Sequence, residues 1–123
     1  MHPAIQFTTT KFDVSKEEEN PINPIYGESL LLWLRDKAAD KVDVPEPDYE
    51  DWGWFSYIQW GGRRYMLGAS SDDGEAWTFQ MDKNRTLSEK LLGREKMTVD
   101  DEAWRYFEGI LRAEPEFKDI DSA

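Results

Sequence analysis

Residues 52–82 read WGWFSYIQWGGRRYMLGASSDDGEAWTFQMD, and this stretch decides the fold. Two turn segments divide it into three runs rich in aromatic and aliphatic residues. Gly61-Gly62 is typical of a two-residue hairpin loop, because both positions of a primed turn favour positive φ. Residues 70–74, Ser-Ser-Asp-Asp-Gly, are of the types that turns select. The stretch therefore predicts three sequential strands in an antiparallel meander.

The three runs differ in how their side chains alternate. In residues 75–82, Trp77, Phe79 and Met81 alternate with polar residues, which predicts a strand with one buried and one polar face. Residues 52–60 are aromatic or apolar at nearly every position. That run predicts a central strand that is covered on both faces.

Outward from the meander, the N-terminal half predicts a strand, a helix and a loop. Residues 4–14 are typical of a strand that bulges, ends or is buried on both faces near Thr10. Asn23-Pro24 is typical of a helix start and predicts a helix over residues 25–40. Residues 42–51 hold two prolines and five acids, so we expect an extended connector there.

The C-terminal part predicts two helices. Thr86-Leu87-Ser88-Glu89 fits a capping box, which opens the first of them. The second begins at residues 98–101 and ends before Pro115. From about residue 116 we expect a flexible acidic tail, unless Phe117 and Ile120 dock on the core.

The predicted element order is β-α-β-β-β-α-α. Strands and helices are segregated, which predicts a single α+β domain over residues 1–123. The expected architecture is an antiparallel sheet of about four strands, the N-terminal strand beside the meander, packed against helices.

Charge disfavours several classes of partner. The chain has 15 Lys and Arg against 26 Asp and Glu, a net charge of −11. This field repels phosphate backbones and anionic lipids, so we expect no nucleic acid and no membrane as partner. Residues 83–97 are the exception, with a local charge of +3. Because opposite charges steer encounter, the acidic remainder favours a basic protein partner.

The residue inventory argues against most catalytic chemistry. The chain has no cysteine, and His2 is its only histidine, so thiol catalysis and imidazole-based metal sites or triads are excluded. Phosphate-binding glycine motifs are absent too. We expect no metal and no cofactor, and the inventory favours a non-enzymatic protein while leaving a hydrolytic alternative open. The lack of cysteine and of a signal-peptide layout favours a cytoplasmic protein.

The first functional hypothesis is a non-enzymatic module that docks a basic protein, in the manner of an inhibitor or an immunity protein. Short, acidic, tryptophan-rich chains without catalytic motifs are common among small bacterial proteins of that kind. The expected contact residues are the connector acids, with one aromatic anchor: Asp43, Glu46, Asp48, Tyr49, Glu50 and Asp51.

The second hypothesis is a small-molecule or hydrolytic site between sheet and helices. Aromatic side chains would line the pocket and arginines would orient an anionic ligand. The candidate residues are Trp52, Trp54, Tyr57, Arg63, Arg64, Trp77 and Arg85. An anion site near Lys83-Asn84-Arg85, just ahead of the helix that Thr86 opens, is part of this alternative. The oligomeric state stays open between a monomer and a weak homodimer.

Overall fold

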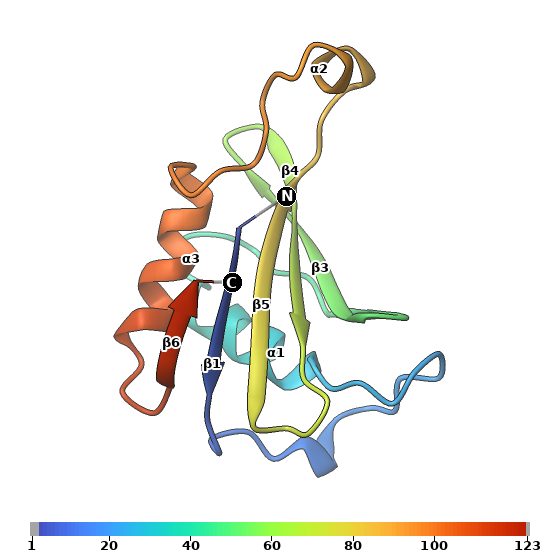
Figure 1. Cartoon of the computed structure of the whole chain (residues 1–123), viewed down its shortest axis with the longest axis vertical. Coiled ribbons are helices and arrows are strands. Elements are labelled where there is room, and N and C mark those ends of the chain that lie inside the picture. Colours follow the sequence, from blue (N-terminus) through green and yellow to red (C-terminus); the bar gives the residue numbers. More distant parts are fainter. Residues whose placement is uncertain (1–2, 123) are drawn as a thin grey trace.

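The computed structural model describes residues 3–122 and has an α+β fold built on one antiparallel sheet (Figure 1). Within these residues the strands are β1 (Ala4–Thr8), β2 (Asp48–Glu50), β3 (Gly53–Trp60), β4 (Arg63–Ser70), β5 (Ala76–Lys83) and β6 (Lys118–Ser122). The helices are α1 (Glu28–Lys37), α2 (Leu87–Leu91) and α3 (Glu102–Ala113), with a 3-10 turn, η1, at Val14–Lys16. The predicted fold class is confirmed, but the sheet is larger than expected.

β3, β4 and β5 form the predicted meander. Ile58 lies opposite Tyr65 across the first hairpin, and Leu67 lies opposite Met81 across the second. Gly61 and Gly62 have φ values of 58° and 78°, as a two-residue primed turn requires. Three strands therefore follow one another through short turns, as the glycine positions predicted.

β1 completes the inner part of the sheet. It pairs antiparallel with β5, with Ile5 opposite Phe79, so it lies beside the meander as predicted. The strand ends at Thr8, close to the predicted irregularity at Thr10. Beyond it Phe12 leaves the sheet and packs edge-on against Trp77, with ring centroids 5.1 Å apart.

Four strands were expected, and β2 is the first of the two additional ones. The connector at residues 42–51 is not a loop throughout, because Tyr49 pairs with Trp54 and extends the sheet beyond β3. Pairing begins only after Pro47, since proline has no amide to donate to a ladder. The sheet order is β2-β3-β4-β5-β1-β6.

β6 is the second additional strand, and it corrects the expected flexible tail. Residues 118–122 pair with β1 at the edge of the sheet, with Asp121 opposite Gln6. The anchor is Phe117, which is buried and stacks on Phe7 with ring centroids 4.3 Å apart. The sequence left open whether Phe117 docks on the core. Because it does, residues 118–122 form a strand instead of a flexible tail.

α1 is shorter than the predicted span of residues 25–40. Tyr26 forms a β-bridge with Ser71, so the helix cannot begin before Gly27. The cap comes from Glu17, whose carboxylate accepts hydrogen bonds from the amides of Gly27 and Ser29 at 3.0 and 2.9 Å. A distant side chain therefore replaces Asn23 as the expected N-cap.

The two C-terminal helices begin as predicted. The capping box of α2 is present, with Thr86 and Glu89 each accepting a hydrogen bond from the other residue's amide. Asp101 caps α3 by accepting from the amide of Ala103 at 2.9 Å. α3 ends at Ala113, ahead of Pro115. No helix in residues 3–122 has the length and apolar character to cross a membrane.

The core lies between one face of the sheet and helices α1 and α3. Phe79 of β5 stacks on Trp104 and contacts Phe107, both from α3. Leu30, Leu31 and Leu34 of α1 are fully buried. The other face of the sheet has no helix over it, so the expectation that residues 52–60 are covered on both faces is wrong. Tyr57 on that face is 43% exposed.

Candidate binding surface

The uncovered face of the sheet is defined by register. Side chains that lie opposite one another in antiparallel strands share a face. A polar row therefore crosses four strands, with a carboxylate at its outer end: Asp121 of β6, Gln6 of β1, Thr78 of β5 and Ser70 of β4. The same alternation that buries Phe79 and Trp77 sends these groups outward.

Trp52 rises from the loop before β3 and covers part of this face. A methyl group placed on Gly68 would lie 2.8 Å from the outer edge of the Trp52 indole, so the ring rests directly on the glycine. Glycine within a strand usually marks such a close approach. The sheet thus carries one large aromatic wall beside a polar floor.

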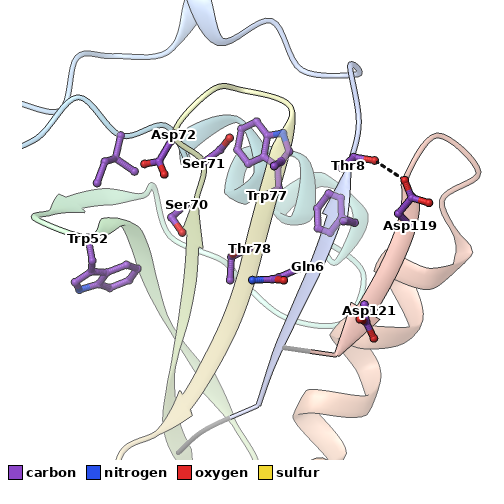
Figure 2. Close-up of a pocket in the computed structure, with 13 residues that line it drawn as sticks. Gln6, Thr8, Trp52, Ser70, Ser71, Asp72, Trp77, Thr78, Asp119 and Asp121 are labelled. Carbon is purple, nitrogen blue, oxygen red and sulfur yellow. Dashed lines mark hydrogen bonds between the residues drawn. The ribbon is translucent and has the colours of Figure 1, made fainter.

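A pocket of about 470 Å³ lies between this wall and the edge strand β6. Figure 2 shows Trp52 on one side of the pocket and Asp119 and Asp121 on the other, with Gln6, Thr78 and Ser70 between them. Asp72, from the turn between β4 and β5, provides the third carboxylate. Phe7, Thr8, Ile25, Ser71, Ala76 and Trp77 complete the lining.

The charges of the pocket are not balanced. Its lining includes three carboxylates and no lysine or arginine. Asp119 accepts a hydrogen bond from Thr8 at 3.4 Å, but neither it nor Asp72 or Asp121 forms an ion pair with a described residue. Carboxylates beside an indole are suited to a positively charged group, which gains both charge pairing and cation–π contact.

The predicted partner-binding residues lie at the opposite edge of the sheet. Asp48 and Glu50 of β2 pair with Phe55 and Gly53, so their side chains share the uncovered face. Tyr49 points the other way, where its ring packs edge-on against Trp54 and stays 41% exposed.

The remaining connector acids are exposed and lie outside this face. Asp43 precedes β2, and Asp51 follows it. The Glu46 carboxylate lies 4.0 Å from the Arg35 guanidinium of α1. The structure thus brings two of the five predicted acids to the face that also holds the pocket.

The residues of the alternative pocket do not converge. Trp54 and Trp77 are buried in the core, and only Trp52 and Trp77 reach the pocket of Figure 2. Tyr57 and Arg85 line a separate cavity of about 160 Å³. Arg64 lies over the Tyr57 ring, 4.3 Å from its centroid.

Several cations around the expected anion site near Lys83-Asn84-Arg85 have partners within the protein. The Arg63 guanidinium donates to both oxygens of Glu89, at 3.0 and 2.8 Å. This ion pair, together with the hydrogen bond from the Thr86 amide, lowers the pKa of Glu89 to about 2. The capping box consumes the helix amides that an anion would need.

Lys83 is also committed to internal partners. Its ammonium lies 2.8 Å from the Asp101 carboxylate, which also accepts a hydrogen bond from the Tyr65 hydroxyl. Burial alone would raise the pKa of Asp101, but the Lys83 contact and the Ala103 amide lower it overall. Arg85 donates to the carbonyl of Arg94. These contacts hold the segment in place. Lys83, Asn84 and Arg85 also line the cavity of about 160 Å³, together with Lys90 and the carboxylate of Asp82.

Sequence reasoning missed most of the pocket. For Gln6, Thr78 and Ser70, the sequence indicated only that they occupy outward-facing positions of strands. For Asp72 it indicated only a position in a turn. The alternation in Asp119-Ile120-Asp121 was the available sign of a sixth strand. Gly68 inside a strand was the sign of the indole above it.

Among residues 3–122, no group of acids or other ligating side chains is arranged to hold a metal ion. Comparison with family models, with curated proteins and with solved structures found no match to this chain.

Proposed function

We propose that this protein is a non-enzymatic binding module that docks a basic segment of another protein on the uncovered face of its sheet. The observation that carries the proposal is the pocket of Figure 2, where three unpaired carboxylates and an indole surround a polar floor without any cation. A lysine or arginine side chain would supply the missing charge. This role is that of an inhibitor or immunity-type protein acting in the cytoplasm.

The use of the aromatic residues supports this proposal over a small-molecule site. The largest rings, among them Trp54, Trp77 and Trp104, are buried between sheet and helices. The arginines that would orient an anionic ligand lie outside the pocket. What the uncovered face offers is negative charge along both edges, from Asp48 and Glu50 to Asp119 and Asp121.

The experiment compares two variants that have the same net charge. Asp72→Asn/Asp119→Asn/Asp121→Asn removes the pocket carboxylates, while Glu19→Gln/Asp36→Asn/Asp40→Asn removes three exposed acids elsewhere. Each is titrated by calorimetry with an oligo-arginine peptide at low and moderate salt. We expect the pocket variant to lose about tenfold or more in affinity and the control less than about threefold, since screened remote charges contribute little.

Wild-type binding should also weaken steeply as salt rises. An equal loss in both variants, or wild-type affinity that does not change with salt, would contradict docking at this face.

A further inference from the structure

Residues 83–97, here called the arm, expose apolar side chains in an unusual place. The arm leaves the end of β5, carries α2 and returns to α3, and α2 lies at one end of the molecule, away from the other two helices (Figure 1). Leu87, Leu91 and Leu92 are 73, 77 and 64% exposed. Clustered exposed leucines mark an interaction surface.

The arm is held firmly at its base. Arg63 of β4 clasps Glu89 through two hydrogen bonds, and the Lys83 ammonium bridges to Glu95 at 3.3 Å and to Asp101 at 2.8 Å. Met97 is buried. The leucines are therefore presented from a fixed position, which lowers the entropy cost of docking them.

A complementary surface lies on the uncovered face. Phe55 and Tyr57 of β3 are in edge-to-face contact, with ring centroids 5.3 Å apart, and Trp52 rests on Gly68, the register partner of Phe55. These three rings, here called the aromatic strip, are partly exposed, and the Arg64 guanidinium lies over the Tyr57 ring at one end of the strip. Asp48 and Glu50 run along its outer side on β2.

The arm and the aromatic strip are contiguous. Tyr57 of the strip and Lys90 of the arm line the same cavity of about 160 Å³. One continuous patch thus holds leucines beside the cations of the arm at one end, and at the other end the rings of the strip, with Asp48 and Glu50 on the β2 side and Arg64 over Tyr57. A two-fold axis through such a patch makes the same contact twice, which is how most homodimers are built.

We propose that the arm docks on the aromatic strip of a second copy, giving a two-fold dimer in which each copy contributes both surfaces. The leucines cover the Trp52 and Phe55 rings, and Lys90 and Arg94, which form no ion pair with a described residue, face Asp48 and Glu50. This inference goes beyond the proposed function, because the dimer forms without any basic partner. Both contacts use Trp52, Asp48 and Glu50, so dimer formation and a basic partner compete for this part of the face.

Two surfaces of the second copy could receive the arm: its aromatic strip or its own arm. Charge favours the strip. The arm carries +3, and the rest of the chain carries −14 because the total is −11. Arm against arm would bring like charges together, which is unfavourable, whereas arm against strip pairs opposite charges. The other apolar surface to which a basic, leucine-bearing segment is suited is an anionic membrane, and the experiment separates the two.

The first test measures mass against concentration by sedimentation equilibrium in physiological salt. From about 5 to about 500 μM, the wild type should rise from 14.4 kDa toward twice that mass. Leu87→Ser/Leu91→Ser/Leu92→Ser should raise the dissociation constant by about a hundredfold or more, because three buried leucines are lost. The control Leu32→Ser, at an exposed leucine of α1, should change it less than about twofold.

The second test is a charge exchange between the two surfaces. Lys90→Glu/Arg94→Glu reverses the arm, and Asp48→Lys/Glu50→Lys reverses the side of the strip. Each variant alone should be monomeric, with a thermal melt showing that it is folded. Mixed together, they should form a heterodimer, because both of its contacts again pair opposite charges.

Three outcomes overturn the proposal: a wild type that stays monomeric throughout, a leucine variant that dimerises like the control, and a variant mixture that stays monomeric. Monomeric protein that binds vesicles containing phosphatidylserine through its leucines would also overturn it, in favour of a membrane surface.

Discussion

The two faces of the sheet share one backbone register and differ in almost every other respect. On the covered face, Phe79 is fully buried between Trp104 and Phe107. On the other face, the neighbouring Thr78 belongs to a polar row that ends at Asp121. Alternate side chains of each strand point to opposite faces of the sheet. The comparison shows that one set packs in the core, while the other set faces outward and can contact a partner.

We expect the substitution with the largest effect on the free energy of unfolding to lie on the covered face. Phe79→Ala should lower the free energy of unfolding by about 3–5 kcal/mol, because it leaves a cavity among rings that cannot close around it. Thr78→Ala, one residue away on the uncovered face, should change it by less than about 1 kcal/mol. Urea denaturation of both variants measures the contrast. Similar losses in the two would mean that the faces do not differ in this way.

A smaller effect is expected where the covered face reaches the edge strand. Phe117→Ala removes the ring that stacks on Phe7 and should cost about 2–4 kcal/mol. The amides of β6 should then exchange with solvent much faster, since the anchor of the strand is gone. Lys118→Ala, at the exposed neighbour, serves as the control. Unchanged exchange in β6 after Phe117→Ala would show that pairing with β1 alone holds the strand.

On the uncovered face, the contact between Trp52 and Gly68 should have a moderate effect. Gly68→Ala introduces a methyl group 2.8 Å from the indole and should cost about 1–2 kcal/mol as the ring moves. In a Trp52→Ala background the same change should cost less, because the flexible Gln80 side chain, 2.9 Å from the new methyl group, is then the remaining close contact. A double-mutant cycle gives the coupling. Equal costs in both backgrounds would place the Trp52 ring elsewhere.

The smallest expected effect is the pH dependence that comes from Glu89. Unlike the carboxylates of the pocket, the Glu89 carboxylate is paired with an arginine. The pKa of Glu89 is lowered from 4.5 to about 2 by Arg63 and the Thr86 amide. A lowered folded-state pKa means that the ion pair stabilises the arm above about pH 4.5 and is lost as the pH falls toward 2. Carboxyl NMR titration should give a pKa near 2 in the wild type and a higher one in Arg63→Gln. A wild-type pKa near 4.5 would show that the Arg63–Glu89 ion pair does not form.

The sequence predicted the inner fold because its signals there are local. The alternation around Phe79, the Gly61-Gly62 turn and the capping box at Thr86 each depend on residues close in the chain. β2 and β6 depend on partners far away: Tyr49 follows two prolines, and β6 is anchored by a ring on Phe7. α1 is capped by Glu17, ten to twelve residues before the amides it holds.

The candidate site was harder to predict than the fold. Trp52 and Trp77 of the pocket were named from the sequence, but its three carboxylates, Asp72, Asp119 and Asp121, were not. These residues come together only because β6 pairs with β1 and the β4–β5 turn closes over the same face. Such an assembly follows from strand order, which no short stretch of sequence contains.

The most direct test is a backbone-amide NMR map of the protein during titration with an oligo-arginine peptide. We predict shift changes at Gln6, Thr78 and Asp121 and in the turn at Asp72, with little change along α1 and α3. Changes spread evenly over the acidic residues of both faces, or concentrated on the helices, would contradict a recognition surface on the open side of the sheet.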